Sequence, residues 1–202
     1  LNSGKTYEES MEMANIAAST VIKKIGTATV NKKEIEEIYE NKNKVLNRKF
    51  YSSNSEILKK IQTIRSKNMK IVMTNGCFDI VHAGHIHLLE NAKKLGDFMI
   101  VAINSDKSVK ALKGKKRPVN KLSARIEVLK ALSCVDLVVV FNELTPLRTI
   151  KMISPDVLVK GGDYKIKDVV GADLVKAKKG KVKIVKIKKG YSTTKILLSQ
   201  NI

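Results

Sequence analysis

From Lys70 onward, short apolar runs alternate with segments of helical period, and no other feature constrains the fold so strongly. We expect strands at 71–74, 98–104, 137–141, 157–160 and 182–187. We expect helices at roughly 84–95, 106–112, 122–132, 146–152, 168–178 and 193–200. Buried strands separated by helices form a parallel sheet with helices on both faces. The sequence therefore predicts an α/β fold built on a doubly wound, five-stranded parallel sheet, whose ligands bind beyond the carboxyl ends of the strands.

A small helical segment precedes this sheet. The capping pattern Thr6-x-x-Glu9 opens a helix that ends at Gly26, and Asn31-x-x-Glu34 opens a shorter one. The apolar stripe of the first helix consists of Met11, Ala14, Ala18, Val21 and Ile25. Two helices with apolar faces and no sheet of their own need a partner. We therefore assign residues 1–40 to the tail of an upstream domain, the lysine-rich residues 41–54 to a linker, and residues 55–202 to the main domain, which opens on a helix capped by Ser53-x-x-Glu56.

The composition bounds the partners and the compartment. Lysine and arginine number 39 against 19 acidic residues, a net charge of +20. Such charge suits nucleic acid, but the lysines are spread over every segment and aromatic residues make up only 4%. We favour compositional drift and expect no nucleic-acid partner. No apolar run is long enough for a bilayer and no signal peptide opens the chain, so we expect no membrane partner. Two cysteines make no disulfide framework, which favours a reduced, cytoplasmic protein. The first residue is Leu1, which suggests a piece of a longer chain.

All three histidines lie in one short stretch that follows the first strand. His82 and His85 are three residues apart at a strand-to-helix junction, and Gly84 between them lets a ligand approach the backbone. Free N–H groups and the helix dipole point to the same place. A zinc site would need a different spacing or cysteine ligands. The stretch therefore predicts an anion site, most simply for phosphate.

A second hydroxyl-rich helix start lies near the end of the chain. Ser192, Thr193 and Thr194 follow Gly190 and open the last expected helix. Ser192 alone would serve as an N-cap, but three hydroxyls at a helix N-terminus also suit a polyphosphate. A nucleoside triphosphate could bridge this helix start and the one at His82.

Several spaced motifs carry a resemblance to a known family. They are Gly76-Cys77-Phe78-Asp79, His82-Ala83-Gly84-His85, Leu112-Lys113-Gly114, Val159 to Tyr164 and Ser192 to Thr194. Together they resemble the cytidylyltransferase-like nucleotidyltransferases, and most closely the adenylyltransferase half of bifunctional heptose 7-phosphate kinase/heptose 1-phosphate adenylyltransferases. The resemblance covers roughly residues 69 to 200. It implies a Rossmann-like nucleotidyltransferase fold and adenylyl transfer from ATP, with Mg²⁺, to heptose 1-phosphate for lipopolysaccharide synthesis.

The resemblance also implies roles for residues. Catalytic roles fall to His82, His85 and Lys113. Nucleotide binding falls to Asn75, Gly76, Cys77, Phe78, Gly84, Gly161, Asp163, Ser192, Thr193 and Thr194. Acceptor binding falls to Asp79, Asp106 and Arg125, although Arg125 suits a surface helix position equally well. We interpret Cys77 as a small turn residue and not as a nucleophile, and we expect no metal ligand from the protein itself.

Alternatives stay open at this point. Another phosphorylated acceptor, such as glycerol 3-phosphate, would keep the reaction class, with ATP or CTP as donor. Related cytidylyltransferases tend to carry arginine where this chain has Ile187, which leans toward ATP. An RNA-binding protein and an inactive nucleotide-binding remnant are the two readings outside the class. Residues 14–30 resemble the last helices of a ribokinase-like kinase, but its Gly-Ala-Gly-Asp motif is absent, so we expect no kinase activity here. We expect the protein to be a homo-oligomer, and specifically a dimer.

Overall fold

A computed structural model describes residues 7–23, 29–38, 50, 53–162 and 164–186. The chain divides into two compact units, residues 1–48 and 49–202. The predicted linker at 41–54 lies almost wholly outside the described residues, as do Thr6, Ile25, Gly26 and the helix expected at 193–200.

The first unit contains helix α1 (Tyr7–Lys23) and a second, shorter helix at residues 32–38. The backbone N–H of Glu34 donates to the Asn31 side chain at 2.8 Å, which confirms the predicted cap of the second helix. Met11 and Val21 of the predicted apolar stripe are 52% and 38% exposed, whereas Ile16 on another face is buried. The described part of the stripe is therefore exposed, and the partner domain stays a prediction.

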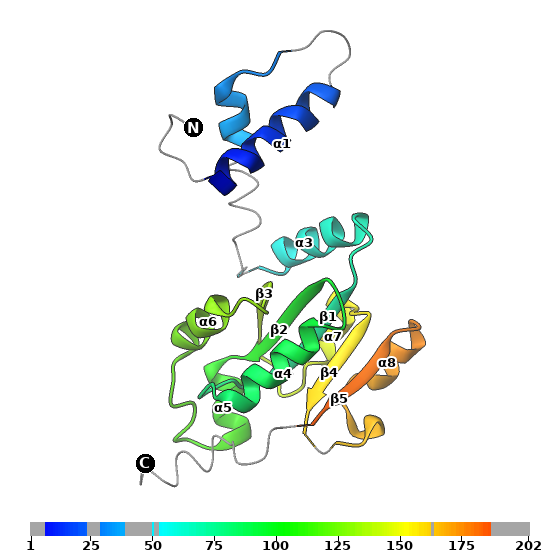
Figure 1. The fold of residues 1–202 in the computed structure, drawn as a ribbon. Coiled ribbons are helices and arrows are strands. Elements are labelled where there is room, and N and C mark those ends of the chain that lie inside the picture. The colour runs from blue at the N-terminus through cyan, green and yellow to red at the C-terminus, as the bar shows by residue number, and fades with distance from the viewer. Residues whose placement is uncertain (1–6, 24–28, 39–49, 51–52, 163, 187–202) are drawn as a thin grey trace. The chain divides into compact units, whose positions relative to one another are not determined.

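The second unit is built on five parallel strands in the order β3-β2-β1-β4-β5 (Figure 1). They are β1 (Ile71–Gly76), β2 (Phe98–Asn104), β3 (Leu137–Phe141), β4 (Val157–Gly161) and β5 (Lys181–Val185). This order confirms the predicted doubly wound sheet. Four strand bounds were wrong by one or two residues: β1 continues through Asn75 and Gly76, which pair with β2, β4 continues through Gly161, and β5 begins at Lys181 and ends at Val185.

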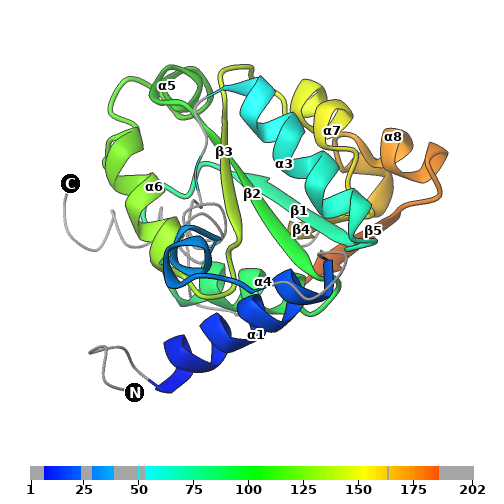
Figure 2. The ribbon, with the colours of Figure 1, turned by 90° about the horizontal axis from the view of Figure 1, so that it is seen from above.

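Helices cover both faces of the sheet (Figure 2). One face carries α3 (Asn54–Ser66), α7 (Leu147–Ile153) and α8 (Ala172–Ala177), and the other carries α4 (Ala83–Lys93) and α6 (Leu122–Ala131). The short α5 (Asp106–Lys113) follows β2. Alternate residues of β1 enter opposite cores, Ile71 and Met73 with α3 and α7, and Val72 with α4 and α6. This alternation is the period of a strand buried on both faces.

Local signals set the starts of α3 and α8. Ser53 accepts the Glu56 N–H at 3.3 Å and donates to the Glu56 carboxylate at 3.0 Å, which confirms the predicted capping box. The helix expected at 168–178 is shorter than predicted. A 3-10 turn occupies Ile166–Asp168, and α8 begins only after Gly171, whose φ of +85° lies in the left-handed region.

Three aspartates fasten the amino edge of the sheet, and each precedes a strand by one residue. Asp97 accepts the Lys70 N–H at 2.8 Å, Asp136 that of Met99 at 2.6 Å, and Asp156 that of Ile71 at 2.7 Å. Each carboxylate therefore joins the start of its own strand to the start of the neighbouring strand. These bonds fix the parallel register at the edge opposite the expected site.

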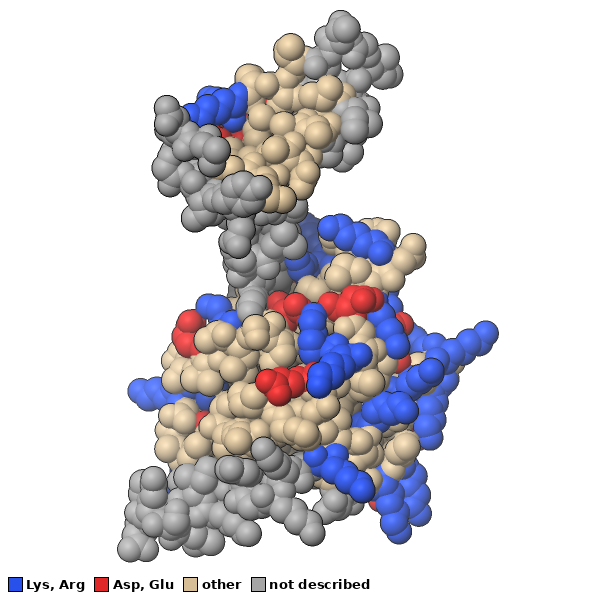
Figure 3. Space-filling model, in the orientation of Figure 1, with Lys and Arg blue, Asp and Glu red and all other residues tan. Residues whose placement is uncertain are grey.

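The strand order reverses between β1 and β4. After β1 the chain builds β2 and β3 on one side, then crosses to place β4 and β5 on the other. Loops that leave β1 and β4 diverge at such a switch point and leave a crevice. Figure 3 shows basic side chains on many parts of the described surface, densest toward α8 and β5, where Lys176, Lys178, Lys179, Lys181 and Lys183 are exposed. Within the described ranges, none of the helices has the length and apolarity that a membrane span requires.

Candidate active site

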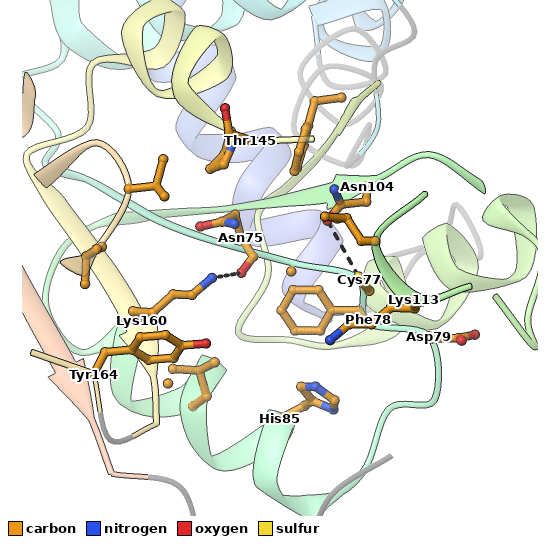
Figure 4. Close-up of a pocket in the computed structure, with 18 of the residues that line it drawn as sticks. Asn75, Cys77, Phe78, Asp79, His85, Asn104, Lys113, Thr145, Lys160 and Tyr164 are labelled. Carbon is orange, nitrogen blue, oxygen red and sulfur yellow. Dashed lines mark hydrogen bonds between the residues drawn. The ribbon is translucent and has the colours of Figure 1, made fainter. Parts of the chain in front are cut away.

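A cavity of about 760 Å³ opens at the carboxyl ends of β1, β2 and β4 (Figure 4). This volume is in the range of small-molecule sites. Its lining combines the β1–α4 loop, the ends of β2 and β4, and the segments before α7 and α8. The polar or charged residues that line it are Asn75, Cys77, Asp79, His82, His85, Asn104, Lys113, Arg117, Thr145, Lys160, Tyr164 and Asp168.

His82 and His85 lie together at the start of α4. His82 is the N-cap residue with an extended backbone, and the His85 N–H donates to the His82 carbonyl at 2.8 Å. Their ring centroids are 4.0 Å apart with planes 28° from parallel, and the Phe78 ring lies 5.1 Å from His85. Both imidazoles therefore share one side of the strand-to-helix junction, as predicted. Gly84 also lines the cavity.

Burial decides the charge of the two histidines. It lowers the pKa of His85 to about 4, with a smaller contribution from a charged His82, and it lowers the pKa of His82 as well. The buried Nδ1 of His85 has no hydrogen-bond partner within the described part of the chain. At neutral pH His85 is thus a neutral imidazole at a helix N-terminus, and an anionic ligand would raise its pKa toward the charged form.

Two lysines, Lys113 and Lys160, also line the cavity. Lys113 lies at the end of α5, and Lys160 at the end of β4 places its Nζ 3.2 Å from the Asn75 carbonyl of β1. Burial lowers the pKa of Lys160. In Figure 4 Lys160 reaches across the cavity wall toward Asn75, with the Tyr164 ring beside it and His85 on another side of the cavity.

Asp79 holds the loop that follows α5. It is buried, and its carboxylate accepts Arg117 Nε at 2.6 Å, the Val119 N–H at 3.0 Å and the Asn120 N–H at 2.9 Å. Burial alone would raise the pKa of this carboxyl, but the three donors outweigh it and hold the pKa below its usual value. Figure 4 shows the carboxylate turned away from the cavity. Its observed bonds thus serve the loop and not a ligand.

Arg125 does not fit either expectation. It is only 1% exposed, so the surface position is wrong, and among the described residues that line the cavity neither Arg125 nor Asp106 appears. Its guanidinium donates to the carbonyls of Cys77 at 2.7 Å, Asn104 at 2.8 Å and Asn120 at 3.1 Å, and to Asp106 at 2.7 Å. Arg125 therefore joins the ends of β1 and β2 from within the protein.

Cys77 has the environment of an inert thiol. Burial raises its pKa, and its Sγ lies 3.8 Å from Asn104 Oδ1. A thiol whose pKa is raised carries little thiolate at neutral pH. The geometry is that of a small residue in the turn after β1.

Comparison with known proteins decides the family. The sequence model of the family described as cytidylyltransferase-like matches residues 73–198, more than half of the chain. The chain belongs to the cytidylyltransferase-like family. The match begins inside β1 and contains every segment that builds the cavity.

This chain is also similar to part of several longer curated proteins. The bifunctional protein HldE of Hydrogenovibrio crunogenus is 48% identical over 96% of this chain, and that of Haemophilus ducreyi is 49% identical over 96%. The chain spans only 40% of the length of each. A solved structure, the lipopolysaccharide core biosynthesis protein from Thermoplasma volcanium, is 34% identical, covers 61% of this chain and 99% of its own, and has a TM-score of 0.49.

The cavity of this cytidylyltransferase-like chain unites most of the predicted residues that the structure describes. Those at its wall are Asn75, Gly76, Cys77, Phe78, Asp79, His82, Gly84, His85, Lys113 and Gly161. Asp163, Ser192, Thr193 and Thr194 lie outside the described residues. Sequence reasoning assigned no role to Asn104, Thr145 or Lys160. A polar residue at the carboxyl end of a buried strand was the signal available for Asn104 and Lys160.

The cavity offers little to hold a resident metal ion. Within the described ranges, no group of three or more His, Cys, Asp or Glu side chains has the arrangement of a metal site. Its walls are cationic or neutral apart from Asp79, already bonded to three donors, and Asp168. Such a donor set suits an ion that arrives on phosphate oxygens better than an ion held by the protein itself.

Proposed function

We propose that this domain transfers the adenylyl group of ATP to D-glycero-β-D-manno-heptose 1-phosphate, giving ADP-heptose and pyrophosphate. The observation that carries the proposal is the pair of stacked imidazoles at the N-terminus of α4, facing a cavity that Lys113 and Lys160 also line. Membership of the cytidylyltransferase-like family supports the reaction class. Similarity to HldE proteins supports the choice of substrate pair through the resemblance described above.

The reaction joins two anions, so the protein must position them and stabilise charge. An oxygen of the sugar 1-phosphate attacks the α-phosphorus of ATP, and the bond from that phosphorus to the bridging oxygen of the β-phosphate breaks. The electron pair leaves with pyrophosphate. The nucleophile is already an anion, so no general base is required.

Each residue then has a role in that step. The imidazoles of His82 and His85, with the free N–H groups of α4, would hold the α-phosphate while charge spreads over its oxygens. Lys113 and the predicted hydroxyls of Ser192, Thr193 and Thr194 would stabilise the departing pyrophosphate. Mg²⁺ bound to the phosphates supplies further charge neutralisation. The loop at Gly161 and Asp163 would lie beside the nucleobase.

The test is pyrophosphate release from ATP with the heptose 1-phosphate, with CTP and glycerol 3-phosphate as parallel substrates. We expect turnover only with ATP and the heptose. We expect His85→Ala to lower kcat about 10²- to 10³-fold, the scale of losing one oxyanion donor. His87→Ala is the matched control, because His87 lies on the same helix but not at the cavity wall. Turnover with CTP or glycerol 3-phosphate would keep the reaction class and discard the heptose assignment.

Four further expectations remain proposals. The protein is a homodimer, which light scattering of the full chain would test. It is cytoplasmic, and it binds no nucleic acid, which salt-dependent RNA affinity without nucleotide turnover would contradict. Residues 1–40 are the tail of an upstream kinase-like domain and have no kinase activity of their own.

A further inference from the structure

Lys160 is a half-buried cation of the cavity lining to which the proposed reaction gives no role. It is the last residue but one of β4, and its Nζ donates to the Asn75 carbonyl at 3.2 Å. The Tyr164 ring centroid lies 5.9 Å from the same Nζ. No carboxylate within the described ranges forms an ion pair with it at 4.0 Å or less. An ammonium group has three donors, so two remain for a ligand.

The surroundings of Lys160 disfavour its charge unless an anion is present. Burial lowers its pKa most, Cys77 acts in the opposite direction but less, and the nearby Lys113 lowers the pKa by a smaller amount again. A buried lysine without a carboxylate is costly to keep charged. A dianionic ligand at Nζ would reverse that balance. The position therefore suits a phosphate group better than a neutral part of a substrate.

The cavity has two polar sides, and Lys160 lies near their junction. The imidazoles line one side, at α4. Asn75, Asn104 and Thr145 line another, at the ends of β1 and β2 and before α7 (Figure 4). If the α-phosphate of ATP lies over the start of α4, the side with the two amides and the hydroxyl is left for a polyhydroxylated acceptor. Lys160 holds the carbonyl of Asn75, where β1 enters the cavity.

Two phosphates must meet at this junction although both are negative. Their repulsion is larger in a cavity than in water, because the effective dielectric constant is lower. Arg117 is already paired with Asp79 through Nε, and we place Lys113 at the pyrophosphate. We propose that Lys160 binds the non-attacking oxygens of the acceptor's phosphate and so sets both acceptor affinity and the choice of a phosphorylated acceptor. This inference rests on the proposed function. Lys160 keeps its proton throughout the step and is a binding group, not a base.

The test compares Lys160→Met, which keeps the length of the side chain and removes the charge, with Lys160→Arg. Lys167→Met is the matched control, because Lys167 is an exposed lysine of the neighbouring 3-10 turn. The full chain is titrated with heptose 1-phosphate, and separately with unphosphorylated heptose, in the presence of α,β-methylene-ATP. We expect Lys160→Met to weaken heptose 1-phosphate about 10- to 100-fold, the scale of a charge-assisted hydrogen bond. Affinity for free heptose and for the ATP analogue should stay within about threefold, and Lys160→Arg should recover part of the loss.

The controls separate this inference from the proposed function. Equal weakening of heptose and heptose 1-phosphate, or a larger loss for the ATP analogue than for the acceptor, would overturn the role of Lys160. If the wild-type protein turns over no heptose 1-phosphate, the heptose assignment fails. Orthophosphate titrated into the same analogue complex then tests Lys160 alone. Phosphate binding that disappears in Lys160→Met supports the inference, and phosphate binding that the variant retains refutes it.

Discussion

Replacing Arg125 by methionine should destabilise the protein more than it impairs acceptor binding. The substitution removes four hydrogen bonds and leaves the carbonyls of Cys77 and Asn104 without the guanidinium that they accept. Each orphaned buried acceptor costs about 1–3 kcal/mol. The Asp106 side chain is 40% exposed, so water compensates most of its loss. The sum is about 2–6 kcal/mol, equivalent to a fall in Tm of about 4–24 °C.

Urea denaturation followed by far-UV circular dichroism measures this loss. Arg148→Met is the matched control, because the Arg148 side chain is 80% exposed and meets Glu143 only at 3.6 Å; it should cost under about 1 kcal/mol. Arg125→Lys keeps the charge but offers one ammonium group for four separated acceptors. We therefore expect it to lower the free energy of unfolding by more than half as much as Arg125→Met does. A stable Arg125→Met protein whose acceptor KM rises more than tenfold would refute the structural role and restore acceptor binding.

Three other outcomes follow from the structure. When the pH falls from 7.5 to 5.0, the free energy of unfolding of the wild type should drop by about 2 kcal/mol more than that of His85→Gln. The reason is that the unfolded histidine takes up a proton in this range, whereas folded His85, with its pKa of about 4, does not. Urea melts of both proteins at the two pH values measure the difference, and an identical fall in both would contradict the low pKa. Asp79→Asn should cost about 2–3 kcal/mol and increase amide hydrogen exchange at Val119 and Asn120, whose N–H groups it accepts; unchanged exchange there would show that the loop holds itself. Gly171→Ala should cost more than about 1 kcal/mol, because φ is +85° and the new Cβ would lie 2.6 Å from Ile150 Cδ1; a variant as stable as wild type in thermal melts would contradict that packing.

Most strands and helices could be predicted because each is marked by residues within or next to it in the sequence. Each strand is an apolar run between turn residues, and the caps at Ser53 and Asn31 bond within four residues. The histidine pair was predictable for the same reason, since three-residue spacing at a helix start fixes the side that both rings share. The shortened α8 was not, because its helical period continues back through Gly171 and only the backbone angle shows the break.

Long-range placement explains what the sequence could not show. Arg125 occupies an ordinary helix position, and its burial depends on carbonyls at residues 77, 104 and 120, which come from three separate segments. Asp79 follows the same logic, with partners about 40 residues along the chain. Lys160 lies near the end of an apolar strand, where a lysine ordinarily marks the return to solvent. Only the pairing of β4 with β1 turns that position into a cavity wall.

The three aspartates at the amino edge of the sheet bear on how such a domain can change its substrate. They secure strand register through bonds to backbone N–H groups, independently of any side chain at the other edge. The alignment of the strands therefore does not depend on the residues around the cavity. Substitutions there can alter which acceptor fits while the pairing of the sheet persists. A domain fastened in this way is a tolerant starting point for laboratory evolution toward new ligands, provided that Asp97, Asp136 and Asp156 are left in place.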